Sequence, residues 1–166
     1  MNDKDKAIRL YDLIKSGQIL EAKKTLNSDT NLLSFITPFG SWLHISAREG
    51  ELELTKFLLE LGMDININEG VPRYSALAAA ASEGHLNVVE FLYNKGAVLD
   101  ISDSSCNPIF SAIYGGHLDI VKFLVSKGID ISIKYSGDRM KNMGAYEFAV
   151  ERGELEIAEY LKMKFK

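Results

Sequence analysis

A repeat of about 33 residues is the feature that most restricts what this chain can fold into. Five glycines mark the repeat, at spacings of 33, 34, 32 and 37 residues: Gly17, Gly50, Gly84, Gly116 and Gly153. The two most similar copies, residues 87–96 and 119–128, read NVVEFLYNKG and DIVKFLVSKG, and each follows Gly-His-Leu. A fixed period of this length is typical of small units that bury their apolar faces only against neighbouring units.

Alignment on these glycines produces columns of apolar residues. Offsets of two, four, seven and eight residues after the last four glycines hold these four columns: Leu52, Leu86, Leu118, Leu155; Leu54, Val88, Ile120, Ile157; Phe57, Phe91, Phe123, Tyr160; and Leu58, Leu92, Leu124, Leu161. These offsets lie on one side of an α-helix, so they describe an apolar stripe. Each repeat is therefore predicted to contain a helix that faces the core and follows the glycine.

Smaller residues precede the glycines and predict a first helix in each repeat. Residues 78–81 are four consecutive alanines, and residues 41–48 read SWLHISAR. Alanine has the highest helix propensity, and small side chains let adjacent units stack closely. The glycine itself is expected to end this helix in the left-handed conformation, where a Cβ atom would be unfavourable. The two helices of a repeat then form an antiparallel hairpin.

With these motifs the chain resembles the ankyrin repeat family, whose signature includes Thr-Pro-Leu-His-x-Ala followed by Gly-His. Residues 41–47 and 107–112 are imperfect copies of the first motif, and residues 84–85 and 116–117 match the second. The resemblance covers residues 5 to 161 and implies an all-α ankyrin-repeat solenoid of about five helix-turn-helix repeats with little or no strand. The expected repeats of this single domain are residues 5–35, 36–69, 70–101, 102–135 and 139–166.

The first and last repeats depart from the pattern in ways that suit capping repeats. Glu21 and Lys24 stand where later repeats have apolar residues, which predicts a more polar outer face, as terminal repeats need. The last repeat lacks a Thr-Pro-Leu-His match. About four extra residues fall within 132–143, where an insertion in a repeat array is expected to form a loop. Trp42 stands where the family usually has proline and is expected in the core.

Composition favours one domain in a reducing compartment. The 166 residues contain no apolar run approaching the length of a membrane span, and the charged start does not resemble a secretory signal. A single cysteine, Cys106, excludes an internal disulfide, so we expect a cytoplasmic protein that is monomeric when alone.

The residues do not favour catalysis, a metal, a cofactor or nucleic acid. The three histidines, His44, His85 and His117, recur at repeat positions, whereas a catalytic or metal site needs dissimilar groups that converge. We interpret them as hydrogen-bonded turn residues. The net charge of −4 opposes binding to a polyphosphate, which depends on lysine and arginine.

A non-enzymatic protein-binding module is therefore predicted. The resemblance places the contacts of such a module on the concave face, formed by the first helices and the turns between repeats. Aromatic residues and arginine are enriched in binding hot spots, and carboxylates would suit a basic partner. The predicted contact residues are Arg48, Glu49, Arg73, Tyr74, Glu83, Asp103 and Tyr114.

The partner is a protein that these residues do not name. A short acidic chain with divergent ankyrin repeats resembles bacterial immunity proteins, which neutralise a secreted toxin, and an acidic inhibitor would suit a basic nuclease toxin. A general cytosolic adaptor and an effector directed at a host cell are the alternatives. A binding surface on the convex side also stays open, because the fold alone does not define the function.

Overall fold

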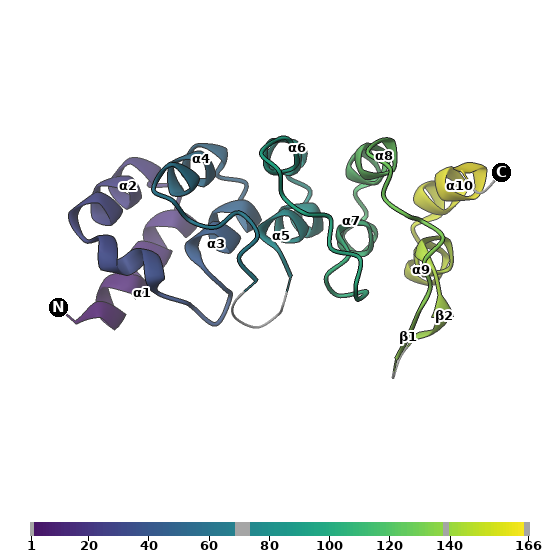
Figure 1. The fold of residues 1–166 in the computed structure, drawn as a ribbon, viewed down its shortest axis with the longest axis horizontal. Helices are drawn as coiled ribbons and strands as arrows, with labels where there is room; N and C mark the ends of the chain where they lie inside the picture. Colours follow the sequence, from purple (N-terminus) through teal and green to yellow (C-terminus); the bar gives the residue numbers. More distant parts are fainter. Residues whose placement is uncertain (1, 69–73, 138–139, 165–166) are drawn as a thin grey trace.

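Two parallel rows of helices make up the elongated molecule in the computed structural model, which describes residues 2–68, 74–137 and 140–164 (Figure 1). The elements are α1 Asp3–Lys15, α2 Ile19–Ser28, a 3-10 helix η1 Thr30–Ser34, α3 Trp42–Arg48, α4 Leu52–Glu60, α5 Ala76–Glu83, α6 Leu86–Asn94, α7 Pro108–Gly115, α8 Leu118–Ser126, β1 Tyr135–Gly137, β2 Met140–Met143, α9 Ala145–Arg152 and α10 Leu155–Lys164. The odd-numbered helices form an inner row and the even-numbered helices an outer row. The mainly helical repeat architecture predicted from the sequence is confirmed.

The predicted apolar columns form the core. At offsets four and eight every side chain is at most 1% exposed, and Leu92 and Leu124 are fully buried. The aromatic column at offset seven is half-buried and packs against this core. Leu155, at offset two in the last repeat, departs from the prediction because it is 69% exposed. No later repeat within the described residues packs over α9 and α10, so this apolar position is left uncovered.

The marker glycines set the spacing between adjacent repeats. Gly50 and Gly84 have φ angles of 73° and 87°, in the left-handed conformation that we expected at the end of each first helix. A Cβ atom on Gly50 would lie 2.5 Å from Nδ1 of His85, and one on Gly84 would lie 2.6 Å from Cε1 of His117. Each of these histidines therefore packs where the glycine of the preceding repeat leaves room. His117 is also hydrogen-bonded, with Nε2 3.1 Å from the carbonyl oxygen of Ser82.

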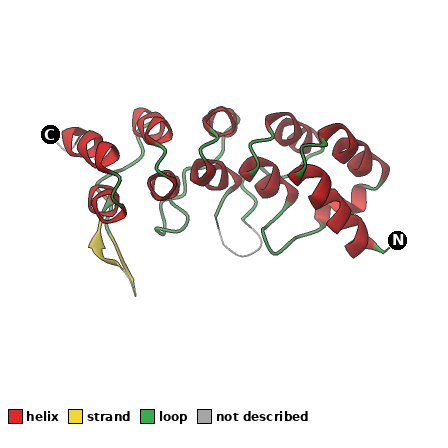
Figure 2. Cartoon of the chain, turned by 180° about the vertical axis from the view of Figure 1, so that it is seen from behind, coloured by secondary structure: helices red, strands yellow, loops and turns green. Residues whose placement is uncertain are grey.

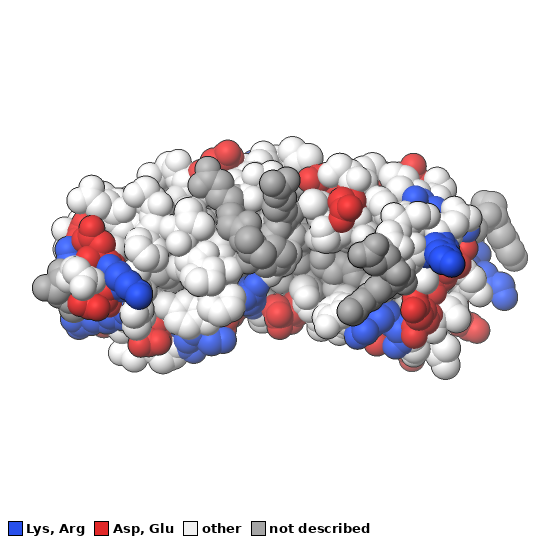
Figure 3. All heavy atoms as spheres, turned by 90° about the horizontal axis from the view of Figure 1, so that it is seen from below, with Lys and Arg blue, Asp and Glu red and all other residues white. Residues whose placement is uncertain are grey.

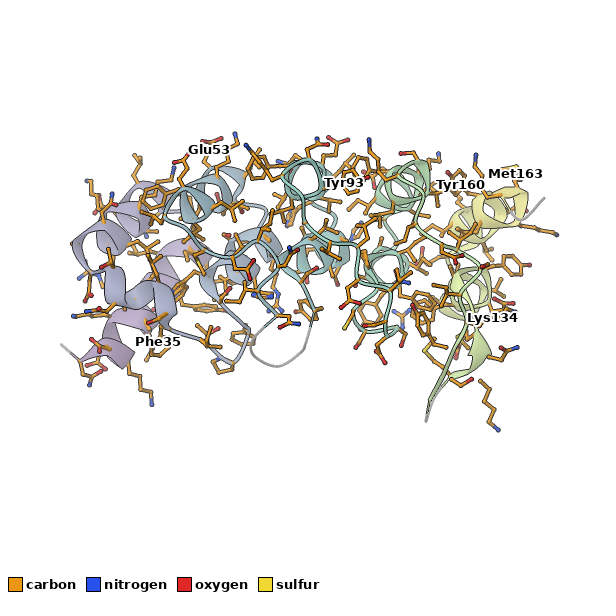
Figure 4. The ribbon with its side chains drawn as sticks, viewed as in Figure 1. Phe35, Glu53, Tyr93, Lys134, Tyr160 and Met163 are labelled. Atoms are coloured by element: carbon orange, nitrogen blue, oxygen red, sulfur yellow. The ribbon has the colours of Figure 1, made fainter. Side chains whose placement is uncertain are left out.

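Lysine side chains lie over the aromatic rings of the outer row. Three of them reach from one repeat to the ring of a later repeat in the stack: Lys23 to Phe57 at 5.3 Å, Lys56 to Phe91 at 5.9 Å, and Lys122 to Tyr160 at 5.8 Å. Lysine can bury its aliphatic stem on an apolar surface while its ammonium group stays in water. The labelled side chains of Glu53, Tyr93 and Tyr160 show that this row carries charged and aromatic groups together (Figure 4).

The first repeat caps the array, but its apolar stripe is displaced from the later pattern. Glu21 and Lys24 are exposed, as expected for a polar outer face. The buried residues of α2 are Ala22 and Leu26, at offsets five and nine from Gly17. At offsets four and eight, which are buried in later repeats, Glu21 is exposed and Thr25 is half-buried.

The insertion within residues 132–143 forms a β-hairpin, which corrects the prediction of a loop. Strands β1 and β2 are antiparallel and pair Tyr135 with Met143 and Gly137 with Met140 (Figure 2). The Tyr135 hydroxyl donates a hydrogen bond to the carbonyl oxygen of Ile101 at 2.7 Å and accepts one from Nδ2 of Asn107 at 3.0 Å. These contacts attach the hairpin to the preceding turn.

Trp42 anchors the first two repeats, and its expected core position is confirmed. Its side chain is fully buried, and its ring lies 6.4 Å from the stacked ring of Phe35. The indole Nε1 donates a 2.6 Å hydrogen bond to the carbonyl oxygen of Leu32. The residue that replaces the usual proline therefore connects η1 to α3.

His44 is a buried imidazole with hydrogen bonds on both sides. It is 2% exposed, its Nδ1 accepts from the backbone N–H of Ser41 at 3.2 Å, and its Nε2 lies 2.8 Å from the carbonyl oxygen of Tyr74. Burial disfavours the charged ring and lowers the pKa of His44 below its ordinary value of 6.5.

We expect this pKa shift to make the free energy of unfolding depend on pH. Because the folded pKa lies below the unfolded one, the unfolded chain binds more protons in the window between them. The stabilisation is complete above pH 6.5 and is lost as the pH falls through the folded pKa. Urea unfolding at a series of pH values should show this slope below pH 6.5, and His44→Gln should reduce it. An unchanged slope in the variant would contradict this account.

Candidate functional site

A groove of about 230 Å³ lies between the first helices and the projecting turns of the C-terminal half. It is lined by Ser82, Ser104, Ser105, Phe110, Ser111, Tyr114, Met140 and Phe148. Helices α5, α7 and α9, the turn before α7 and strand β2 all contribute side chains. This is the concave side on which contact residues were expected.

Aromatic rings form the apolar part of the groove. Phe110 stacks on Phe148 with ring centres 5.1 Å apart. The ring of Tyr135 packs edge-to-face against Phe110, with ring centres 5.2 Å apart. Asn107 holds α7 in position, since its buried side chain accepts a hydrogen bond from the backbone N–H of Ile109. With Pro108 in the first turn, the start of α7 is well defined. The groove therefore has a rigid apolar floor.

Tyr114 is the predicted contact residue that lies directly in the groove. Its side chain is 59% exposed, although the guanidinium of Arg152 lies 4.3 Å from the centre of its ring. A cation stacked at this distance restrains the ring and leaves much of its surface open to solvent. Arg152, at the end of α9, was not among the seven predicted contact residues.

Two predicted carboxylates, Glu83 and Asp103, are exposed near this groove. Glu83 ends α5 next to the lining residue Ser82, and Asp103 lies in the same turn as Ser104 and Ser105. The hydroxyl and backbone N–H of Ser105 donate to Asp103 at 2.7 and 2.8 Å, and these bonds lower the pKa of the Asp103 carboxyl. Within the described part of the chain, neither carboxylate forms an ion pair. Their charge is therefore available to a ligand.

Arg48 and Tyr74 were expected to face a partner, but the structure pairs them with each other. Arg48 Nη2 donates a hydrogen bond to the Tyr74 hydroxyl, and its guanidinium lies 5.5 Å from the ring of Phe39. Tyr74 is half-buried rather than exposed, and its ring also packs edge-on against His44. This pair therefore belongs to the packing between the second and third repeats.

Glu49 also falls outside the groove. Glu49 forms an ion pair with Lys15, with Oε1 2.9 Å from Nζ, and this pair neutralises the charge of Glu49 within the molecule. Arg73 lies outside the described residues. Of the seven predicted contact residues, the structure thus brings together Glu83, Asp103 and Tyr114. Phe148 and Phe110 were missed, although aromatic residues in a first helix otherwise rich in small side chains were a visible signal.

Further hollows lie elsewhere on the described part of the molecule, two of them beside aromatic rings. One, of about 460 Å³, lies between the outer helices α4 and α6, where Lys56 and Lys95 approach the ring of Phe91. The other, of about 300 Å³, lies between α1 and the turn before α3.

The described residues contain neither a candidate metal-binding cluster nor a candidate membrane-spanning helix. No group of three or more histidine, cysteine, aspartate or glutamate residues there could hold a metal ion. No helix in this part of the chain has the length and apolar character needed to cross a bilayer.

Proteins similar in sequence to this chain also contain ankyrin repeats, in agreement with its paired helices. Residues 43–135 match the family model described as ankyrin repeats in three copies. The Notch-regulated ankyrin repeat-containing protein A of Danio rerio is 36% identical over 90 residues, covering 51% of this chain and 78% of that protein. The human Notch-regulated ankyrin repeat-containing protein is 33% identical over 90 residues, covering 51% and 76%.

A much longer protein is similar to about half of this chain. The ankyrin repeat and SAM domain-containing protein 6 of Rattus norvegicus is 28% identical over 89 residues, which cover 53% of this chain but only 10% of the rat protein. The match to the family model spans more than half of this chain. This chain belongs to the ankyrin repeat family, a family of protein-interaction modules.

Proposed function

We propose that this protein binds a segment of a partner protein in the groove formed by α5, α7, α9 and the adjoining turns, and that it acts without catalysis. The observation that carries the proposal is Tyr114, which is 59% exposed while Arg152 holds its ring. An aromatic side chain that is already restrained loses little conformational freedom when it is covered. Exposed tyrosines of this kind are common binding hot spots.

The charges beside the groove support a basic partner segment. Glu83 and Asp103 are exposed, and hydrogen bonds from Ser105 keep Asp103 in its charged form. A lysine or arginine on the partner would complement these carboxylates, which accelerates association and favours one orientation. The apolar rings of Phe110 and Phe148 would contact the uncharged residues between such cations.

Tyr114→Ala should weaken partner binding by about tenfold or more, as expected when a hot-spot side chain is removed. The partner is first isolated with the full chain and identified by mass spectrometry, and its affinity is then measured by calorimetry. Leu20→Ala is the matched control, because Leu20 is 76% exposed on α2, far from the groove. Equal affinities for wild type and Tyr114→Ala would rule out this groove as the binding site.

Charge reversal at Glu83 and Asp103 should mainly slow association. A basic partner is steered by the carboxylates, so the wild-type association rate should also fall as salt screens them. Reversal of Glu90 and Glu159 on the outer helices is the control for net charge, because both are exposed and lie in the other row. An association rate that does not depend on salt would argue against a basic partner.

As the specific role of this binding, we propose that the protein acts as a monomer in the cytoplasm and neutralises a toxin, with a basic toxin domain as its partner. The exposed carboxylates near the groove support it because a basic nuclease domain would complement them. Co-expression with the product of a neighbouring reading frame tests this proposal. Rescue of growth by the wild type but not by Tyr114→Ala would support it.

An adaptor function is the alternative to toxin neutralisation. The names of the Danio rerio and human relatives, which describe Notch-regulated ankyrin repeat-containing proteins and mention no toxin, support this alternative. Survival of the same cells without this protein would favour the adaptor.

A further inference from the structure

The hollow of about 300 Å³ between α1 and the turn before α3 opens at the N-terminal end of the inner face. Its lining residues are Lys4, Ala7, Ile8, Tyr11, Phe35, Thr37, Pro38 and Phe39. Helix α1 forms one wall and the turn before α3 forms the other, and Phe35 lies at this end of the molecule (Figure 4). The face that carries the turns shows a broad uncharged area in its N-terminal half, with charged groups at the margins (Figure 3).

Both walls of this N-terminal pocket are held in position. Lys4, Ile8 and Tyr11 are spaced by four and three residues, so they share one face of α1. In the opposite wall, Thr37 and Gly40 exchange two backbone hydrogen bonds of 3.0 Å, and the Thr37 hydroxyl accepts from the backbone N–H of Phe39 at 3.0 Å. The ring of Tyr11 stacks 5.7 Å from that of Phe39. The pocket is therefore formed before any ligand arrives.

The pocket leaves apolar groups uncovered. Ile8 is 53% exposed and Phe39 is 44% exposed, although both are large apolar residues. An exposed apolar area with charged groups at its edge is typical of a binding surface. The space is sufficient for one large side chain but not for a folded element.

Two cations, Lys4 in the pocket lining and Arg48 beside the ring of Phe39, indicate what kind of segment would fit. Lys4 lines the pocket and forms no ion pair with any residue that the structure describes. Arg48 lies 5.5 Å from the ring of Phe39, and its described contacts are with aromatic groups rather than carboxylates. Asp3 and Asp5, on either side of Lys4, and Asp12, one turn after Ile8, supply opposing charges on α1. The nearby lysine Lys15 is already neutralised by Glu49.

We propose that this pocket binds one apolar side chain of a partner protein, a leucine, isoleucine or phenylalanine with aspartate or glutamate on either side. The apolar side chain covers Ile8 and Phe39, while the flanking carboxylates face Lys4 and Arg48. This inference rests on the proposed function and adds a second contact of opposite charge to that near Glu83 and Asp103. A bound segment would then have only one favourable direction along the inner face.

Peptide display on the full chain tests the chemistry of this pocket. A random twelve-residue library is selected on the immobilised wild type, with soluble Ile8→Gln protein present to remove peptides that bind elsewhere. The expected peptides carry one large apolar residue with acidic neighbours. Enrichment of basic or uncharged peptides instead would overturn the proposal.

The affinity of a selected peptide is then measured by fluorescence anisotropy. Ile8→Gln and Lys4→Glu should each weaken it by about tenfold or more, as for the loss of a central contact. Leu20→Gln and Lys162→Glu are the matched controls, since Leu20 is 76% exposed on α2 and Lys162 is exposed on α10. Circular dichroism checks that each variant keeps its helices. Equal losses in variants and controls, or no loss, would overturn the proposal.

Two further outcomes separate this inference from the proposed function. If Tyr114→Ala weakens binding of the intact partner and Ile8→Gln does not, the pocket proposal is wrong and the groove proposal stands. If Ile8→Gln weakens binding and Tyr114→Ala does not, the reverse holds. Light scattering that shows a dimer lost in Ile8→Gln would identify the occupant as a second copy of this chain and overturn the proposal of a partner protein.

Discussion

Replacement of Trp42 by alanine should lower the free energy of unfolding by about 3–5 kcal/mol, the range for removal of a large buried aromatic side chain. Trp42, the first residue of α3, is fully buried, and its indole donates a hydrogen bond to the carbonyl oxygen of Leu32 in η1. The variant loses this apolar burial and leaves a cavity that the helices can only partly close. It also removes one of the two hydrogen bonds to the Leu32 carbonyl oxygen, which still accepts from the backbone N–H of Phe35. Urea unfolding followed by circular dichroism would measure the change.

Trp42→Phe separates the two contributions. Phenylalanine keeps an aromatic ring beside Phe35 but lacks the N–H group. Because the backbone N–H of Phe35 still donates to the Leu32 carbonyl oxygen, this variant should lose about 0.5–1.5 kcal/mol for the missing hydrogen bond. If Trp42→Ala unfolds at the same urea concentration as the wild type, Trp42 does not anchor the first two repeats.

Leu92→Ala should lower the free energy of unfolding by about 2–5 kcal/mol, because a fully buried leucine is removed from the central repeat. Adjacent repeats stabilise one another, so damage in the third repeat should spread to both sides. Leu161→Ala removes an equally buried leucine from the same column of the last repeat, which has one described neighbour. The loss at Leu92 should therefore be larger. Urea unfolding of both variants measures this difference.

Leu20→Ala controls for the chemical change itself, because this leucine is 76% exposed on α2. Its unfolding midpoint should stay close to that of the wild type. An unchanged midpoint for Leu92→Ala would show that the proposed helix register is wrong. Equal losses at Leu92 and Leu161 would instead show that the repeats unfold without strong coupling.

The repeat architecture could be predicted because its determinants are local and recur. Leu92 and Leu124 occupy the same offset after a glycine, and the same helix geometry buries both. The end of each first helix was predictable for the same reason, since Gly84 takes the left-handed conformation that other residues avoid. The hairpin at residues 135–143 was not predicted, because no other repeat contains a copy of it. Its position depends on the contact of Tyr135 with Ile101 in another turn.

The candidate site was only partly predictable, because a residue's position on the concave side does not define its partners. Tyr114 and Arg48 both end first helices, yet Tyr114 remains exposed and Arg48 is bonded to Tyr74. The difference arises from contacts between residues 26 positions apart, which the repeat pattern does not contain. Glu49 was likewise predicted as a contact residue, but Lys15 of the preceding repeat pairs with it.

The histidines that pack on Gly50 and Gly84 have a mechanical consequence. Since a side chain occupies the place of each missing Cβ atom, neighbouring repeats cannot slide past one another without a clash. The first helices of the inner face are therefore held at fixed spacings and do not adjust to a bound segment. A peptide that touches both Phe39 and Tyr114 must span the distance between them, so a partner segment with too few residues could not contact both.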